Sequence, residues 1–228
     1  MLITGIRTGI GLYLAQYYAQ KEYRVVGISR GELAEAIVGC EHSCVDVSDE
    51  KAVKSLMFRI KKEYGRLDVL INNVGVNSAL SLAMSSDIEA SRKTMDVNFF
   101  GSFITAREAA KLMMKNKFGR IINISSMAVK HEVQGEAVYT ASKAALTAFS
   151  RVFAKEVYPI GITCNVIAPS VIETHLSKAI DPGALAEVLK RNAIPEYGKM
   201  EDVSNAIDHF ISPSSGSITG QVLYLGGA

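Results

Sequence analysis

The sequence is poor in several residue types that mark particular classes of protein. Its 228 residues include no tryptophan, five prolines and three cysteines. Cys40, Cys44 and Cys164 are odd in number and show neither CxxC nor zinc-ligand spacing, so the sequence predicts no disulfide framework and no metal site. No apolar run approaches the ~20 residues that a membrane helix needs, and the opening MLITGIRTGIGLYLA does not resemble a signal peptide. We therefore expect a cytoplasmic protein.

Neither sign of charge dominates the sequence. The 25 Lys+Arg residues nearly balance the 23 Asp+Glu residues, which gives a formal net charge of +2. Because this is not a polyelectrolyte balance, we expect neither a nucleic acid nor a membrane surface as partner. The length and the 48% hydrophobic content suit a single domain over residues 1–228. A small molecule is the expected partner.

Short β-branched runs alternate with longer segments of helical periodicity along the whole chain. The β-branched runs are 2–4, 24–28, 43–45, 67–71, 120–124, 162–167 and 221–225, and the helical segments are 9–21, 49–63, 86–117, 136–158 and 201–211. This alternation predicts a Rossmann-type, doubly wound three-layer α/β/α sandwich with a mostly parallel sheet of about seven strands. Ligands of such sheets bind beyond the carboxyl ends of the strands, so we expect the chemistry there.

A glycine-rich loop follows the first expected strand. Residues 4–11 read TGIRTGIG and lead directly into an amphipathic helical segment. Glycines in this position let the backbone turn tightly and approach a pyrophosphate, whose charge is met by free helix N–H groups and the helix dipole. The spacing is G-x-x-x-G-x-G, not G-x-G-x-x-G. Taken alone, the loop is also compatible with a tight turn that binds nothing.

Residues 138–143 read VYTASK, which places Tyr139 four positions before Lys143. On a helix this spacing brings the phenol and the ammonium onto one face, about one turn apart. The pair alone is not diagnostic, because Tyr17 and Lys21 show the same spacing and about one such pair is expected by chance. We interpret Tyr17 and Lys21 as core and surface residues.

Together with the glycine loop, this pair resembles the short-chain dehydrogenase/reductase family. Further motifs of that family follow in order over almost the whole chain: NNVG at 72–75, VNFFG at 97–101, NISS at 123–126, NVIAPSVIET at 165–174 and TGQVLYLGG at 219–227. Ser126 precedes Tyr139 by the family spacing of 13 positions. Three positions depart from the family pattern, with Val74 for Ala, Ser170 for Gly and Leu225 for Asp.

The resemblance implies a catalytic set of Asn98, Ser126, Tyr139 and Lys143. Tyr139 would exchange a proton with the substrate oxygen, and Ser126 would hydrogen-bond the same oxygen. A tyrosine with its ordinary pKa near 10 is a poor proton exchanger at neutral pH. We expect the Lys143 ammonium, aided by an oxidised nicotinamide, to supply the ~4 kcal/mol that would bring this pKa near 7. The resemblance also implies that Lys143 holds the nicotinamide ribose and that Asn98 holds a water leading to solvent.

The resemblance further implies a dinucleotide cofactor and the residues that would bind it. These are Gly5, Arg7, Thr8, Gly9, Ile10, Gly11, Ser29, Arg30, Asp46, Val47, Asn73, Val74, Gly75, Tyr139, Lys143, Pro169, Ile172 and Thr174. After the second strand the sequence has Ser29 and Arg30, with no acid before Glu32. A carboxylate there would repel a 2′-phosphate, whereas arginine pairs with it. We therefore expect NADP(H), with NAD(H) as the alternative.

The expected substrate is a ketone or secondary alcohol, bound under a loop at about 174–195. The family resemblance favours a 3-oxoacyl thioester ketoreductase, and the basic run Lys111–Lys117 near Arg120 suggests a carrier protein that delivers the substrate. A sugar, polyol or other alcohol dehydrogenase is the alternative, and a catalytically silent NADP-binding scaffold is a third. We interpret His131 as a solvated loop residue, with a position on the pocket wall as the alternative. By resemblance, the segments 86–117 and 136–158 are expected to form a homodimer or homotetramer.

Overall fold

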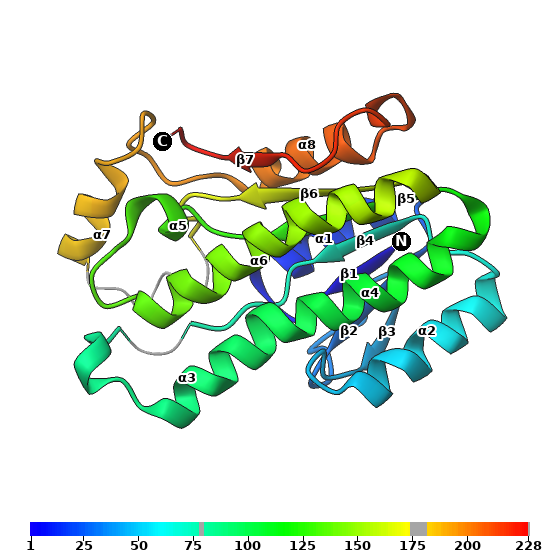
Figure 1. The fold of residues 1–228 in the computed structure, drawn as a ribbon, viewed down its shortest axis with the longest axis horizontal. Coiled ribbons are helices and arrows are strands. Elements are labelled where there is room, and N and C mark those ends of the chain that lie inside the picture. The colour runs from blue at the N-terminus through cyan, green and yellow to red at the C-terminus, as the bar shows by residue number, and fades with distance from the viewer. Residues whose placement is uncertain (78–79, 174–181, 228) are drawn as a thin grey trace.

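The computed structural model describes residues 1–77, 80–173 and 182–227. In these ranges seven strands form one parallel sheet in the order β3-β2-β1-β4-β5-β6-β7 (Figure 1). The strands are β1 Leu2–Thr4, β2 Val25–Ser29, β3 Cys40–Cys44, β4 Val69–Asn72, β5 Gly119–Ile124, β6 Ile162–Ala168 and β7 Val222–Tyr224. From β1 to β3 the chain adds strands on one side of β1. It then crosses over, and β4 to β7 are added on the other side of β1. The predicted fold is confirmed.

The helices cover both faces of this sheet. They are α1 Gly9–Gln20, α2 Glu50–Tyr64, α3 Ile88–Met95, α4 Ser102–Met113, α5 Ala128–His131, α6 Ala137–Val157, α7 Pro182–Leu189 and α8 Met200–Ile211. One hydrophobic cluster joins the sheet to α2, α4 and α6, and a second joins its other face to α1 and α8 (Figure 1). Because both faces are covered, the inner strands are buried at every position.

The edge strand β3 begins three residues earlier than the sequence led us to expect. Its residues CEHSC are mostly half-buried, and it pairs in parallel with β2, so that His42 lies opposite Gly27 and Cys44 opposite Ser29. An edge strand has one neighbour and a partly wet surface, so it carries no apolar run that would mark it in the sequence.

The helix expected over 86–117 is divided into two. A π-helical segment, Asp96–Gly101, separates α3 from α4. The short helices α5 and α7 were not predicted. No helix of the described residues is long and apolar enough to cross a membrane.

Candidate active site

A cavity of about 650 Å³ lies beyond the carboxyl ends of the strands. Its walls come from the segments that follow β1 to β6, as the fold predicts for a doubly wound sheet. The predicted site residues that line it are Gly5, Arg7, Thr8, Gly9, Ile10, Ser29, Arg30, Asp46, Val47, Asn73, Val74, Gly75, Ser126, Tyr139, Lys143, Pro169 and Ile172. Gly11 and Asn98 lie behind the wall, and Thr174 falls outside the described residues.

The glycine loop is shaped to receive an anionic group. Gly5 and Gly9 have φ angles of +77° and +58°, which favour glycine. A Cβ on Gly11 would lie 2.1 Å from the Gly5 carbonyl oxygen, so α1 packs against the loop only with glycine there. Thr8 precedes α1 without a side-chain cap, and the first turn holds no acidic residue. The free N–H groups of this turn therefore suit a pyrophosphate.

The loop after β4 is fixed to the glycine loop. The Thr4 hydroxyl oxygen accepts hydrogen bonds from the backbone N–H groups of Asn73 (3.0 Å) and Val74 (3.1 Å). The Asn73 side chain donates in return to the Thr4 carbonyl at 3.0 Å. These hydrogen bonds hold two walls of the cavity together. Gly75 lies beside Lys143, because a Cβ on Gly75 would be 3.2 Å from Lys143 Nζ.

Positive charge marks the end of the cavity next to β2. Arg7 and Arg30 are both exposed and both line it. Burial acts to raise the pKa of Asp46, but hydrogen bonds from Ser48 and the charge of Arg30 lower this pKa overall. The Ser29 hydroxyl donates to the Gly31 carbonyl at 2.7 Å and also contacts His42 at 2.7 Å. Its proton is therefore already used within the protein, and the two guanidinium groups are the ligands that remain for a phosphate.

Ser126, Tyr139 and Lys143 meet at the far end of the same cavity. Ser126 follows β5, and the other two residues lie one turn apart near the start of α6. The Ser126 side chain acts on the Tyr139 phenol in the direction that lowers its pKa. Lys143 is 3% exposed, donates from Nζ to the Ile124 carbonyl at 2.8 Å, and places Nζ 6.0 Å from the centroid of the Tyr139 ring.

The pKa of Tyr139 departs from the sequence-based expectation. Burial, together with the charge of Glu136, raises the pKa of Tyr139 to about 12, although the Ser126 side chain acts in the opposite direction. Burial also lowers the pKa of Lys143 to about 8. The expected acidification of the phenol is thus not produced by the protein alone, because both charged forms are penalised by burial and the ammonium is directed at a carbonyl. The phenol is neutral at pH 7 and can donate its proton.

Asn98 is fully buried and does not reach the cavity surface. Its Oδ1 accepts from the Val76 N–H at 2.8 Å, and its Nδ2 donates to the Val76 carbonyl (2.8 Å) and the Ser142 hydroxyl (3.0 Å). Both amide hydrogens are therefore used. The π-helical segment directs this side chain between the β4 loop and α6, so Asn98 positions the helix that carries Tyr139 and Lys143.

Residues outside the predicted catalytic and cofactor-binding sets also line the cavity. Glu136 lies one turn before Tyr139, where burial raises its pKa and a hydrogen bond from Asn77 opposes the shift. The interpretation of His131 as a solvated loop residue is wrong. It lines the cavity at the end of α5 and contacts the Asn192 side chain at 2.7 Å, which in turn donates to the Ser170 hydroxyl at 2.7 Å.

Part of the expected substrate loop lies outside the described residues, namely 174–181. The described part contains α7, and Val188 from this helix lines the cavity. Val188 and Asn192 both fall within the expected substrate loop at about 174–195, but no motif singled out either residue.

Residues 5–227 match a profile described as enoyl-(acyl carrier protein) reductase. The match covers nearly the whole chain and decides the family. The chain belongs to the short-chain dehydrogenase/reductase family. As a member, it is an NAD(P)-dependent oxidoreductase.

Individual relatives in this family agree in fold and length. The chain is 32% identical over 232 residues to the 3-oxoacyl-[acyl-carrier-protein] reductase of Escherichia coli K12, with 99% of this chain and 95% of the relative covered. A structure of a variant actinorhodin polyketide ketoreductase with NADPH has a TM-score of 0.89 at 27% identity, covering 99% and 95%. The ligand-free aldohexose dehydrogenase of Thermoplasma acidophilum has a TM-score of 0.87 at 28% identity, covering 99% and 92%.

Proposed function

We propose that this family member is an NADP(H)-dependent ketoreductase that acts on 3-oxoacyl thioesters. The observation that carries the proposal is that Ser126 and Tyr139 line one cavity together with Lys143. Two hydroxyl groups on one cavity wall suit an oxygen atom that gains negative charge, such as a carbonyl under reduction.

In reduction, the bound nicotinamide would supply the hydride to the carbonyl carbon. Tyr139 donates its phenolic proton to the carbonyl oxygen, which agrees with its neutral state at pH 7. Ser126 donates a hydrogen bond to the same oxygen. Lys143, with a pKa lowered to about 8, can return a proton toward the phenolate, and Asn98 holds α6 in place for this exchange.

Arg30 and Arg7 support NADP(H) as the cofactor. Arg30 follows β2, where a 2′-phosphate would be recognised, and it lines the cavity together with Arg7 from the glycine loop. The Arg7 guanidinium reaches the segment after β2, since a Cβ on Gly31 would be 3.3 Å from Arg7 Nη1. The polyketide ketoreductase that shares this fold is also described with NADPH.

The matched descriptions name two different bonds, the C=C of an enoyl thioester and the C=O of a 3-oxoacyl thioester. We favour the carbonyl because Ser126 provides a second hydroxyl beside Tyr139. Apolar side chains on the remaining wall, including Val76, Leu80, Met127 and Val188, suit an acyl chain.

A carrier protein is not expected to dock on the basic run Lys111–Lys117, so this part of the sequence-based hypothesis is corrected. Arg120 is 4% exposed and stacks on Phe118, and Lys111 pairs with Glu108 at 2.8 Å. The run also precedes β5, whereas the cavity follows it, and six residues of strand span about 20 Å. We place carrier docking instead near Lys130 and Arg191, which are exposed beside His131.

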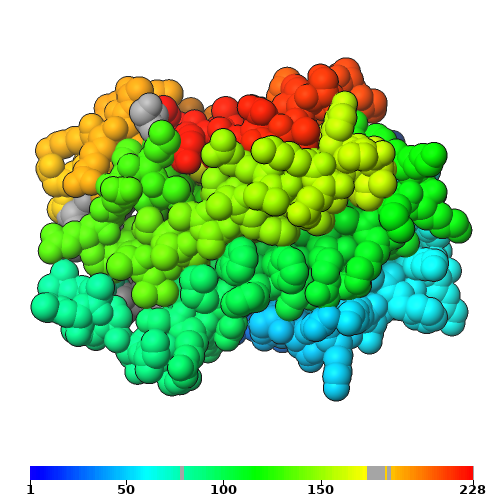
Figure 2. Space-filling model, viewed as in Figure 1, coloured from blue at the N-terminus to red at the C-terminus, as the bar shows by residue number. Residues whose placement is uncertain are grey.

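We also propose a homo-oligomer that packs through the surface of α4 and α6. Large apolar side chains are exposed on and beside these helices, including Phe100, Met114, Val152 and Tyr158. The two helices lie next to each other on the face seen in Figure 2.

All three cysteines are free thiols, which supports a reducing cytoplasm.

A second candidate is a dehydrogenase of a sugar or polyol. It is favoured by the polar groups of Asn77, His131 and Glu136 on the cavity wall and by the likeness to an aldohexose dehydrogenase. A catalytically silent scaffold is disfavoured, because a binding protein has no need of a buried phenol, hydroxyl and lysine together.

A substrate panel tests the proposal. With NADPH, acetoacetyl thioester should be reduced at least ~100-fold more efficiently than crotonyl thioester. With NADP⁺, aldohexoses and polyols should be oxidised more slowly than the 3-hydroxyacyl thioester. A preference for crotonyl thioester would favour enoyl reduction, preference for a sugar would favour the second candidate, and no turnover of any member would favour a scaffold. The difference of ~100-fold corresponds to about 3 kcal/mol in transition-state stabilisation.

A further inference from the structure

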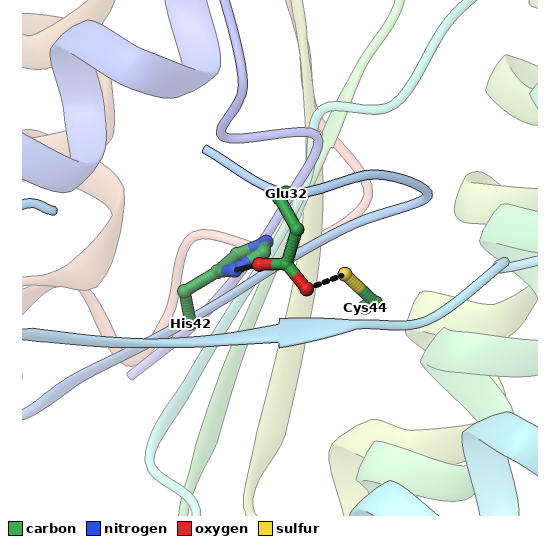
Figure 3. Close-up of side chains that lie close together, drawn as sticks. All are labelled: Glu32, His42 and Cys44. Atoms are coloured by element: carbon green, nitrogen blue, oxygen red, sulfur yellow. Dashed lines mark hydrogen bonds and ion pairs between the residues drawn. The ribbon is translucent and has the colours of Figure 1, made fainter. Parts of the chain in front are cut away.

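Three metal-ligating side chains lie together outside the cavity, at the end of β2 and on β3 (Figure 3). His42 and Cys44 are two positions apart on β3, so both project from the same face of the strand. Glu32 comes from the loop after β2 and lies between them. One ligand atom of each residue falls within 4.8 Å of the other two.

Two separations in the cluster, one to each oxygen of the Glu32 carboxylate, are close to those of a tetrahedral zinc site. Cys44 Sγ is 3.3 Å from Glu32 Oε1, and His42 Nδ1 is 3.7 Å from Glu32 Oε2. Zinc bonds of ~2.0–2.3 Å in tetrahedral geometry place neighbouring ligand atoms about 3.3–3.8 Å apart. The Glu32 side chain is 87% exposed, so its carboxylate is free to adjust onto an ion.

A hydrogen bond behind the cluster fixes the imidazole of His42. The Ser29 hydroxyl donates its only proton to the Gly31 carbonyl at 2.7 Å, so it accepts from His42 Nε2, also at 2.7 Å. This assigns the proton to Nε2 and leaves the lone pair of Nδ1 directed at the Glu32 carboxylate. Metal-binding histidines are oriented in this way by an outer partner of the second ring nitrogen.

The same assignment leaves an electrostatic conflict. An imidazole lone pair and a carboxylate face each other, with a thiol beside them, and a cation between them would remove the repulsion. The positive charge can come either from a second proton on His42 or from a metal ion. Thiolate, imidazole and carboxylate together are a ligand set suited to zinc and poorly suited to Mg²⁺ or Ca²⁺, which prefer oxygen.

We propose that Glu32, His42 and Cys44 bind a Zn²⁺ ion, with water as the fourth ligand. On binding, the Cys44 thiol releases its proton to solvent as the S–Zn bond forms, and there is no change of oxidation state. The two anionic ligands balance the charge of the ion. The site adjoins Ser29, Arg30 and Gly31, which line the cavity, so the ion would tie the loop after β2 to β3.

The sequence argued against a metal because its cysteines lack zinc-type spacing. The cluster uses a single cysteine, and the parallel pairing of β2 and β3 brings its ligands together. The spacing of residues along the sequence does not show that Glu32 lies beside His42 and Cys44, because that depends on the pairing of the two strands.

The test measures Zn²⁺ binding to the full chain by equilibrium dialysis, with Co²⁺ as a spectroscopic probe. We expect one ion per chain and a sulfur-to-cobalt charge-transfer band. Cys44→Ser should abolish the band, and Cys44→Ser and Glu32→Gln should each weaken Zn²⁺ binding at least ~10-fold. Ser29→Ala removes no proposed ligand but deletes the hydroxyl that contacts His42 and the Gly31 carbonyl, and it should weaken binding about 10-fold. Mg²⁺ should not compete.

Matched controls are Cys40→Ser and Glu35→Gln, which change a thiol and an exposed carboxylate outside the cluster. Both should bind Zn²⁺ as the wild type does, and circular dichroism establishes that each variant is folded. The proposal is overturned if the wild type binds no Zn²⁺, or if Cys44→Ser and Glu32→Gln bind it unchanged. A His42 ring that carries protons on both nitrogens in the presence of Zn²⁺ would also overturn it. None of these measurements depends on cofactor binding or turnover.

Discussion

Lys143 places its ammonium nitrogen 6.0 Å from the centroid of the Tyr139 ring, one helical turn further along α6. The other pair with this spacing is closer, since Lys21 Nζ lies 4.5 Å from the centroid of the Tyr17 ring. Tyr17 and Lys21 each donate to Asp208 at 2.7 Å and thereby join α1 to α8. Proximity of the two groups is therefore not what separates the proposed catalytic pair from the structural one. The difference lies in burial and in the Ser126 hydroxyl beside Tyr139.

Glu136→Gln is expected to shift the pH profile of alcohol oxidation to lower pH. The charge of Glu136 contributes to the raised pKa of Tyr139, so its removal lowers that pKa. Oxidation needs the phenolate as base, and its rate therefore reaches half its maximum at a lower pH in the variant. The measurement is kcat against pH with NADP⁺ and a 3-hydroxyacyl thioester. Glu132→Gln, an exposed change in the same segment, is the control, and an unshifted Glu136→Gln profile would contradict the assignment.

Lys143→Met should remove a pH dependence of stability. Burial lowers the folded-state pKa of Lys143 from 10.5 to about 8. Between these values the unfolded chain binds a proton that the folded chain does not, so the wild type loses stability as pH falls from about 10.5 to 8. The shift corresponds to about 3 kcal/mol.

Urea unfolding at several values between pH 7.5 and pH 10.5 measures this effect. Relative to the wild type, Lys143→Met should gain free energy of unfolding as the pH is lowered through the window. Parallel curves for the two proteins would show that Lys143 is charged in the folded state throughout.

Gly11→Ala should abolish dinucleotide binding and destabilise the fold. Alanine is normally favoured over glycine inside a helix by ~1 kcal/mol. Here its Cβ would lie 2.1 Å from the Gly5 carbonyl oxygen and 2.4 Å from Asn73 Nδ2, which forces the loop and α1 apart. Gly216→Ala is the control, because its Cβ would approach no atom closer than 3.8 Å. Titration of NADPH fluorescence and thermal unfolding report the two effects, and wild-type binding by Gly11→Ala would refute this account of the loop.

Arg30→Ala should weaken NADPH binding by about 10- to 100-fold, the range expected for loss of hydrogen bonds to a charged group. Binding of NADH, which lacks the 2′-phosphate, should not change. Arg66→Ala is the control, because Arg66 pairs with Asp68 just before β4, at the amino ends of the strands and away from the cavity. Equal losses for both cofactors would mean that Arg30 stacks on the adenine without recognising the phosphate.

The features that the sequence predicted well are those with a local cause. The periods of the apolar residues located the buried strands and most helices, and the glycine spacing located the loop that α1 packs against. The π-helical segment that contains Asn98 was missed, because one inserted residue barely changes an apolar pattern. Strand β3 was displaced because polar residues form it.

The remaining features depend on long-range packing. His131 and Asn192 are 61 positions apart, and neither carries a motif that would join them. The spacing of Tyr139 and Lys143 predicted a shared helix face but not the direction of Nζ toward Ile124. The direction of a pKa shift follows from burial, which a linear spacing does not contain. The expected acidification of Tyr139 by Lys143 was therefore the least secure inference from the sequence.

Single-turnover oxidation of NADPH by Tyr139→Phe most directly tests the central claim that the Tyr139 phenol provides the proton. With acetoacetyl thioester, the variant should bind NADPH like the wild type but lose about 10²- to 10⁴-fold in rate. Tyr17→Phe, which changes the structural pair, should retain the wild-type rate. A Tyr139→Phe enzyme that reduces the thioester at the wild-type rate would contradict the account.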